Sequence, residues 1–146
     1  MSFFNSINIS ASGLTAERLR MDLISENIAN ANTTRTPSGT PYRRKVAVFR
    51  EQEGSAFDQV LANATGGIAQ GKGVEIAGIV EDQSPFKKEY NPNHPDADAD
   101  GYVSLPNIEI VNEMINLISA SRAYEANITA VNNTKTMAMQ ALEIGK

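Results

Sequence analysis

The sequence predicts a mainly α-helical fold with a small β-rich insertion, in which N- and C-terminal helices pair as a coiled coil. Two apolar patterns with helical spacing, one at each end of the chain, favour this fold class. Between them lie short runs of β-branched residues and stretches rich in Pro, Gly, Asp and Asn. We therefore expect residues 1–34 to form the N-terminal helix, 35–106 a β-rich, extended insertion, and 107–146 the C-terminal helix. The two helices would form one discontinuous axial domain.

The longer predicted helix runs from Ile108 to Ile144, where neither Pro nor Gly interrupts the chain. Asn107 precedes it and supplies a side-chain acceptor for the first free backbone N–H groups. Alternating steps of four and three residues select a predicted apolar seam that includes Ile110, Met114, Leu117, Tyr124, Ile128, Val131 and Leu142. At ~1.5 Å per residue this helix is roughly 55 Å long, which is more than the rest of the chain can cover. It therefore needs a partner of similar length.

The remaining faces of this helix carry few charges. Ala and Asn occupy much of the surface opposite the seam, and Val111, Ile115 and Ile118 form a second apolar ridge. A helix surface that faces bulk water usually carries far more Lys and Glu. We infer that neighbours cover this helix on several sides, so that some neighbours are other molecules. A lone helical hairpin with a neutral surface is the alternative.

The N-terminal helical pattern extends from Phe4 to Ala31. Its main apolar stripe contains Ile7, Leu14, Met21 and Ile28. Gly13 weakens the helix by up to about 1 kcal/mol relative to Ala, so we expect this end to become ordered only when it is packed. The helix should end in the Asn- and Thr-rich segment at residues 30–34, because these side chains compete with the helical backbone.

The middle of the chain predicts short strands joined by extended connections. Tyr42 to Arg50 and Val74 to Val80 have the composition and alternation of strands. Residues 57–61 have the apolar spacing of one helical turn. Ser84 to Pro106 is rich in Pro, Asp and Asn, which indicates an extended connection, with a short third strand at Tyr102 to Leu105.

Composition excludes several classes of function. The chain has 146 residues, 41% of them hydrophobic, and a formal net charge of −4, which argues against nucleic acid as a partner. The absence of Cys excludes disulfides and thiolate metal sites. The N-terminus lacks the basic and apolar segments of a cleaved signal peptide. No apolar stretch approaches the roughly 20 residues that span a bilayer, so we expect no direct membrane insertion.

Motifs that resemble active or metal sites are incomplete. Residues 66–73 match a phosphate-binding loop except that Gly73 replaces the required Ser or Thr, so a nucleotide-binding enzyme is a remote alternative. Asp96, Asp98 and Asp100 match the first positions of a calcium-binding EF-hand loop. The twelfth position of that loop would be Asn107, where the motif requires Glu. No sequence pattern pairs His94, the single histidine, with a Ser or Cys nucleophile or with further metal ligands. We expect no catalytic residue, no cofactor and no metal site.

Two signatures resemble those of bacterial flagellar basal-body rod and hook proteins. The first, at residues 25–34, closes the N-terminal helix and includes Asn27, Asn30, Asn32, Thr33 and Thr34. The second, at residues 115–127, lies in the C-terminal helix and includes Ser121, Arg122, Tyr124, Glu125 and Asn127. The segment from Arg35 to Lys45 is similar to that of the proximal rod members of this family.

The resemblance implies a structural subunit of the flagellar proximal rod. Such a subunit would be exported by the flagellar type III export apparatus without a cleaved signal peptide and would assemble in the periplasm. It would link the membrane ring and export gate to the distal rod and transmit torque for motility. Expected partners are other rod subunits, copies of itself, the ring-to-rod adaptor and the export apparatus.

Two alternatives remain open beside the proximal rod. The first alternative is another rod- or hook-type axial subunit. The second is an adaptor or binding module built as a helical hairpin. For a rod subunit, unfilled seams predict that the first ~30 and last ~35 residues are unprotected in the isolated chain.

Overall fold

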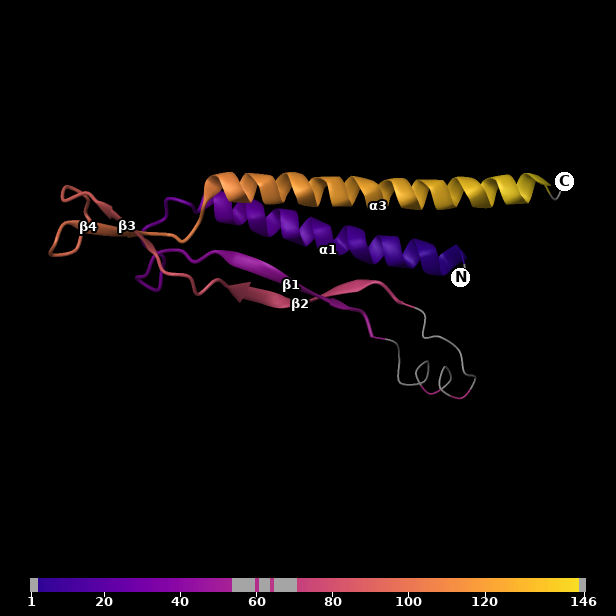
Figure 1. Cartoon of the computed structure of the whole chain (residues 1–146), viewed down its shortest axis with the longest axis horizontal. Coiled ribbons are helices and arrows are strands. Elements are labelled where there is room, and N and C mark those ends of the chain that lie inside the picture. Colours follow the sequence, from indigo (N-terminus) through magenta and orange to yellow (C-terminus); the bar gives the residue numbers. More distant parts are fainter. Residues whose placement is uncertain (1–2, 54–59, 61–63, 65–70, 145–146) are drawn as a thin grey trace. The chain divides into compact units, whose positions relative to one another are not determined.

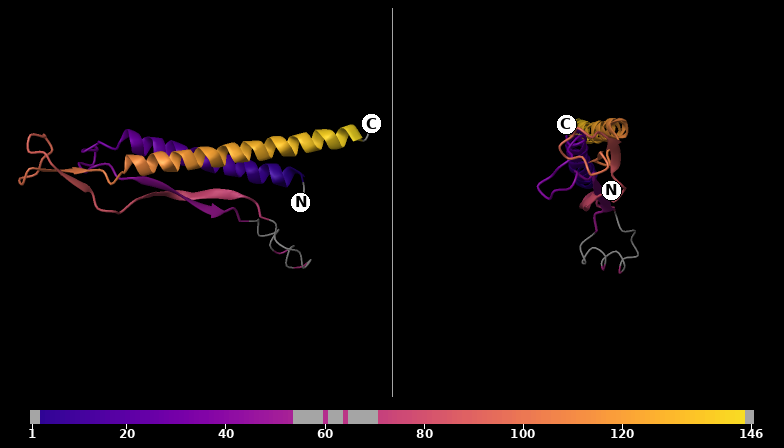
Figure 2. Two further views of the ribbon diagram at one scale, coloured as in Figure 1. Left: turned by 45° about the horizontal axis from the view of Figure 1, so that its top comes forward. Right: turned by 90° about the vertical axis from the view of Figure 1, so that its left-hand side faces the viewer.

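The computed structural model describes residues 3–53, 60, 64 and 71–144. Its two long helices are α1 (Phe3–Ala29) and α3 (Ile110–Ile144). The described strands between them are β1 (Lys45–Glu51), β2 (Val74–Glu81), β3 (Lys87–Tyr90) and β4 (Tyr102–Leu105) (Figure 1). β1 pairs with β2, and β3 pairs with β4 in a separate two-stranded sheet (Figure 2). The prediction of a mainly helical fold with a small β-rich part is therefore confirmed, whereas coiled-coil pairing stays a prediction.

Most predicted elements are present within a few residues of their expected bounds. The main omission is β3, which lies in the segment that we expected to be an extended connection. The capping role predicted for Asn107 is wrong, because α3 begins three residues later and the Oδ1 atom of Asn107 accepts the Arg44 N–H. The helical turn expected at residues 57–61 falls largely outside the described residues.

The chain divides into two compact units, each of which contains parts of both helices. Unit 1 comprises Met1–Arg18, Val48–Gly78 and Ser121–Lys146. Unit 2 comprises Leu19–Ala47 and Ile79–Ala120. These units run across the three segments expected from the sequence, and the division into an axial domain and an insertion stays a prediction.

Unit 2 contains most of the buried side chains of the described residues. Its buried apolar residues come from α1, from the segment before β1, from β4, from the connection between β4 and α3, and from α3: Leu23, Ile24, Tyr42, Val103, Pro106, Ile108 and Ala120. In the β3–β4 hairpin, Lys87 is paired with Leu105 and Tyr90 with Tyr102. Because these buried residues come from several segments that are distant in the sequence, unit 2 has a core of its own.

Unit 1 is held by close approaches of small residues. Among its described residues only Ala16 is a buried hydrophobic residue. The Ser12 hydroxyl accepts the Val74 N–H at 3.1 Å, and a Cβ atom at Gly73 would overlap Ser12. Gly73 also has a φ of +105°, which favours glycine. A Cβ at Gly13 would lie 3.1 Å from the Asn127 side chain, so the glycine that weakens an isolated helix permits this contact with α3.

Hydroxyl groups on both helices bond to the preceding turn of their own helix. The donors to the carbonyl group four residues earlier are Thr15, Ser25, Thr129, Thr134 and Thr136, at 2.8–3.1 Å. Such bonds satisfy the hydroxyl donor without a partner from another element. The three Thr residues of α3 in this set therefore present uncharged hydroxyl groups that are bonded within the helix.

The unequal burial predicts unequal protection of the helices in the free chain. We expect amides of residues 19–29 and 113–120 to exchange with solvent more slowly than those of residues 3–18 and 121–144. Local opening is easier where few apolar side chains are buried, and that applies to unit 1. Hydrogen exchange measured by NMR or mass spectrometry tests this expectation. Equal protection along the whole of α1 and α3 would contradict it.

Candidate functional site

A fully buried amide lies at the centre of a polar cluster in unit 2. Asn27, which is 0% exposed, donates from Nδ2 to the Lys45 carbonyl oxygen at 2.9 Å and to Oε2 of Glu113 at 3.2 Å. Its Oδ1 accepts the Lys45 N–H at 2.9 Å and the Tyr42 hydroxyl at 3.2 Å. An Asn side chain has two donor hydrogens and two acceptor lone pairs, so every hydrogen-bonding position of Asn27 is used.

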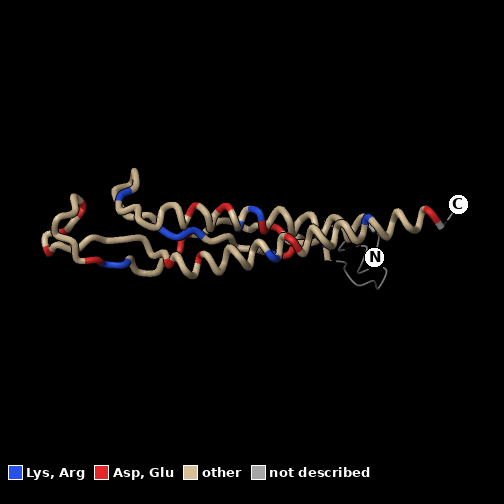
Figure 3. The backbone as a smooth tube through the Cα atoms, turned by 90° about the horizontal axis from the view of Figure 1, so that it is seen from above, with Lys and Arg blue, Asp and Glu red and all other residues tan. Residues whose placement is uncertain are grey.

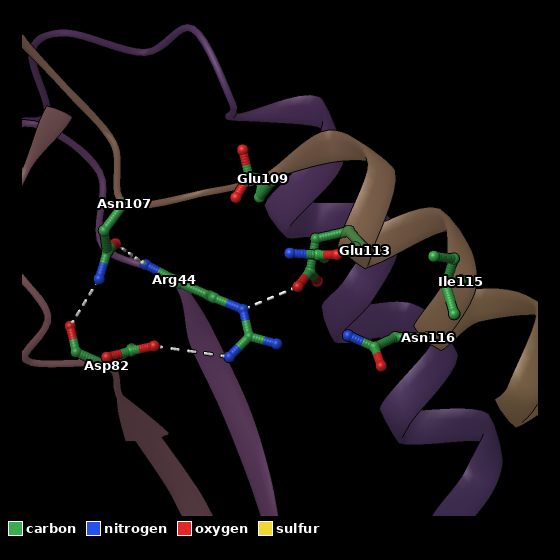
Figure 4. A pocket seen from close by; sticks show the side chains of 8 residues that line it. Arg44, Asp82, Asn107, Glu109, Glu113, Ile115 and Asn116 are labelled. Atoms are coloured by element: carbon green, nitrogen blue, oxygen red, sulfur yellow. Dashed lines mark hydrogen bonds and ion pairs between the residues drawn. The ribbon is translucent and has the colours of Figure 1, made fainter.

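A buried ion pair adjoins this amide. Glu113 of α3 is 1% exposed, and its Oε1 accepts a hydrogen bond from Nε of Arg44 at 2.7 Å (Figure 4). The Nη1 atom of Arg44 lies 3.5 Å from Oδ2 of Asp82. A buried carboxylate is tolerated when it is paired and its remaining oxygen is hydrogen-bonded, and Glu113 meets both conditions.

Backbone contacts complete the cluster. The Arg44 N–H donates to Oδ1 of Asn107 at 3.0 Å, and Nδ2 of Asn107 donates to the Asp82 carbonyl oxygen at 3.0 Å (Figure 4). The Asp82 N–H in turn donates to the Arg44 carbonyl oxygen at 2.8 Å. We call the whole set the polar clamp: Asn27, Tyr42, Arg44, Lys45, Asp82, Asn107 and Glu113. It joins α1, the entry to β1, the end of β2 and the start of α3.

A polar pocket of about 460 Å³ lies beside the clamp. Its lining residues are Arg44, Asp82, Asn107, Glu109, Asn112, Glu113, Ile115 and Asn116 (Figure 4). The charged groups that line it are largely engaged with each other, and the lining contains no Ser, Cys or His that a nearby base would activate. The pocket therefore offers no arrangement for nucleophilic catalysis.

The acidic loop is organised by its own backbone. Oδ1 of Asp98 accepts the N–H groups of Asp100 and Tyr102, at 3.0 and 2.9 Å. Oδ2 of Asp96 accepts the Thr34 hydroxyl at 2.8 Å. In the described ranges, no group of three or more His, Cys, Asp or Glu is placed to hold a metal ion. Most of the glycine-rich segment at residues 66–73 lies outside those ranges.

Local contacts shift the pKa of three groups in or beside the clamp. Hydrogen bonds from the hydroxyl and N–H of Ser84, with a further contribution from Arg44, lower the pKa of Asp82. Burial and then the charge of Glu26 raise the pKa of Tyr42. A hydrogen bond to Glu26 raises the pKa of Lys45. At neutral pH these shifts favour an ionised Asp82, a neutral Tyr42 and a charged Lys45.

The lowered pKa of Asp82 predicts a loss of stability in acid. Ionised Asp82 stabilises the folded state above its unfolded-state pKa, and this contribution is lost as the pH falls through the lower folded-state pKa. Asp82→Asn should therefore reduce the loss of stability between about pH 5 and pH 2. Urea unfolding followed by circular dichroism across this range measures the effect. Identical pH dependence in the variant and the unsubstituted chain would contradict the assignment.

One side of α3 in unit 2 carries exposed apolar side chains. They form what we call the apolar ridge: Ile110, Val111, Met114, Ile115 and Ile118, which are 44–66% exposed. With 3.6 residues per turn, Val111, Ile115 and Ile118 fall roughly opposite the buried Glu113, and Ile110 and Met114 lie at the flank of this side. Charged residues interrupt α3 at only a few points (Figure 3). Most of the ridge therefore faces away from the internal contacts of α3, and Ile115 also lines the edge of the polar pocket.

The predicted seam residues occupy two kinds of environment. Half-buried positions are Ile7, Leu14, Met21, Ile28, Leu117, Tyr124 and Val131. Exposed positions are Ile110, Met114, Ile128 and Leu142. Residues that the apolar spacing did not select, Glu113, Ala120 and Asn127, lie on the inward side of α3. The role of the seam in assembly stays a prediction, and its exposed members are accessible to other molecules.

Several signature residues close α1 and direct the chain toward β1. Nδ2 of Asn30 donates to the Glu26 carbonyl oxygen, and Oδ1 of Asn30 accepts the Thr33 hydroxyl. The Thr33 carbonyl oxygen accepts the Tyr42 N–H. The other signature residues differ in exposure: Ser121 and Tyr124 are half-buried, and Asn32, Arg122 and Glu125 are exposed. The first signature is therefore explained by the fold around the clamp.

The remaining clamp residues were not recognised as a site from the sequence. In the sequence Arg44 and Lys45 belong to a short basic cluster, and Glu113 is one of the few charged residues of its helix. The only sequence feature that pointed to the clamp was Glu113, an acidic residue in a helix with few charges. No spacing rule connects it to Arg44, which is 69 positions away.

Comparisons with known proteins match both ends and the full length of the chain. The family model for flagella basal body rod proteins matches residues 7–35, and that for the C-terminal region of flagellar basal body rod FlgEFG proteins matches residues 99–144. The flagellar basal-body rod protein FlgC of Bacillus subtilis strain 168 is 48% identical, with all of both chains covered. FlgC of Escherichia coli O157:H7 and of Salmonella typhimurium strain LT2 are each 40% identical with the same full coverage.

Proposed function

Because the chain belongs to the FlgC group of flagellar basal-body rod proteins, we propose that it forms part of the proximal rod and assembles through the outer side of α3. Membership of this family identifies a structural subunit of the basal-body rod, not an enzyme. The proximal position, the assembly surface and the transmission of torque are the parts that we propose.

The apolar ridge is the observation that carries the proposed assembly surface. Its five side chains lie together on one side of α3 and are 44–66% exposed. Burial of apolar surface yields about 25 cal/mol per Å², so covering such a ridge in each of many copies stabilises an assembly considerably. Other rod subunits, including copies of this chain, are the partners that we propose for the ridge.

Neutral helices suit close packing of many copies. Exposed Thr hydroxyls on α3 bond to their own helix, and few charges interrupt the surface. Neighbouring helices then approach without burying unpaired charges. In the described residues no helix combines the length and apolarity needed to cross a membrane. Contact with the membrane ring would therefore be made through proteins, which is consistent with a ring-to-rod adaptor and the type III export apparatus as further partners.

Deletion and complementation in the bacterium that encodes the chain test the proposal. We expect the deletion strain to be non-motile and its isolated basal bodies to lack the rod beyond the membrane ring, with both properties restored by the unsubstituted gene. Electron microscopy of basal bodies and swimming in soft agar are the measurements. Intact rods in the deletion strain would contradict a proximal position. A purified chain that stays monomeric and binds one saturable non-rod target would favour the adaptor alternative.

A further inference from the structure

We propose that the polar clamp fixes the register of α1 against α3, that is, which residue of one helix lies opposite which residue of the other. Asn27 and Glu113 are the positioning residues, and Arg44 holds Glu113 in place. This inference concerns the folding of the single chain and does not depend on the proposed function.

The contacts outside the clamp discriminate weakly between registers. At the positions one and two heptads after Glu113, the inward side of α3 carries Ala120 and Asn127, and α1 contributes Gly13 opposite Asn127. On the α3 side these small, neutral residues oppose a slide of seven residues only weakly, whereas on α1 the position one heptad before Asn27 is Arg20. Apolar packing alone therefore leaves more than one alignment of similar energy.

The clamp is satisfied in only one of these alignments. A slide of seven residues in one direction places Asn27 opposite Ala120, which has no polar side chain. A slide in the other direction places Asn27 opposite Pro106, before α3 begins at Ile110. In both cases Asn27 loses Glu113 as an acceptor, and a buried donor without a partner is costly. The observed register keeps every bond of Asn27.

The same amide also fixes the entry to β1. Three of its four hydrogen bonds go to Tyr42 and Lys45, and Arg44 between them reaches Glu113. A slide of α3 would therefore separate Glu113 from two elements at once. In helix pairs a single buried polar residue is known to specify register at some cost in stability, and buried ion pairs contribute less to stability than apolar residues of equal size.

Engineered disulfides report the register directly, because the chain has no Cys of its own. The native pair is Gly13→Cys with Asn127→Cys, since a Cβ at position 13 lies 3.1 Å from the Asn127 side chain. Slides of seven residues are reported by Gly13→Cys combined with either Ala120→Cys or Thr134→Cys. Each pair is placed in the full chain, and its rate of oxidation is measured in dilute solution. The ratio of rates reports register even if the helix ends open transiently.

The three pairs are compared in three backgrounds. With the clamp intact we expect the native pair to oxidise at least about tenfold faster than either shifted pair. With Glu113→Gln, which keeps one of the two acceptor oxygens, we expect the native pair still to oxidise fastest. With Arg44→Met and Glu113→Leu together, we expect this preference to fall to about threefold or less while helix content by circular dichroism is retained. A retained tenfold preference in that double variant would overturn the proposal. Loss of helix content with loss of all three cross-links would also overturn it, because the clamp would then supply stability instead of register.

Discussion

Replacing Ile118 by Asp is expected to abolish incorporation of the chain into rods and swimming, while leaving the free chain as stable as before. Ile118 is 54% exposed and lies on the apolar ridge, opposite the internal contacts of α3. A substitution at such an exposed position changes folding stability by about 0.5 kcal/mol or less. In an assembly the carboxylate would be buried without a partner in every copy, and the cost would be repeated throughout the rod.

Soft-agar motility, electron microscopy of basal bodies and urea unfolding of the purified chain measure the three parts of this prediction. Ser119→Asp is the matched control, because it adds the same charge at an exposed neighbouring position outside the ridge. We expect the control strain to swim. Normal swimming with Ile118→Asp would show that the ridge is not an assembly surface. The sequence-based seam makes the corresponding prediction for Leu117→Asp and Ile128→Asp, with export retained.

Replacing Glu113 by Ala is expected to lower the free energy of unfolding by about 3 kcal/mol. The substitution removes the acceptor of Arg44 and one acceptor of Asn27, and Asn27 is fully buried. Arg44 keeps Asp82 at 3.5 Å and remains partly exposed, so the effect should lie at the lower end of the range for broken buried ion pairs.

Denaturant unfolding of the purified chain measures this effect. Glu113→Gln is the control, since it keeps the size of the side chain and an oxygen acceptor. It keeps only one of the two oxygens that accept hydrogen bonds from Arg44 and Asn27, and its N–H2 group faces the other donor. We therefore expect it to cost about 2 kcal/mol, less than Glu113→Ala. A loss below about 0.5 kcal/mol for Glu113→Ala would show that the clamp contributes little to folding.

The sequence predicted the helices well because their signals are local. Apolar residues at helical spacing, the absence of Pro and Gly from Ile108 to Ile144, and Asn and Thr at residues 30–34 determine where α1 and α3 can form. Strand β3 was missed for the opposite reason. Its residues Lys87–Tyr90 are all exposed, so no alternation marks a buried face. The strand forms because it pairs with β4, and the residues of β3 alone do not predict that pairing.

The clamp lay beyond sequence reasoning because its parts are distant in the chain. Asn27 and Glu113 are 86 positions apart. Apolar spacing assigns polar residues to the outside of a helix, whereas Glu113 points inward because Arg44 and Asn27 satisfy its carboxylate. The seam prediction therefore selected Met114, which the structure exposes, instead of its buried neighbour Glu113. The spacing of apolar residues does not show how α3 is turned about its own axis, because this orientation depends on the pairing of Glu113 with Arg44 and Asn27.

The hydroxyls that bond within their own helix have a consequence for the proposed assembly. Thr129, Thr134 and Thr136 meet any adjoining molecule with their hydrogens already engaged at 2.8–3.0 Å. A small displacement between adjoining molecules then ruptures no bond made by these groups, so the energy changes gradually as the surfaces glide past each other. In the proposed assembly such surfaces would allow small movements between neighbouring copies without the loss of these hydrogen bonds.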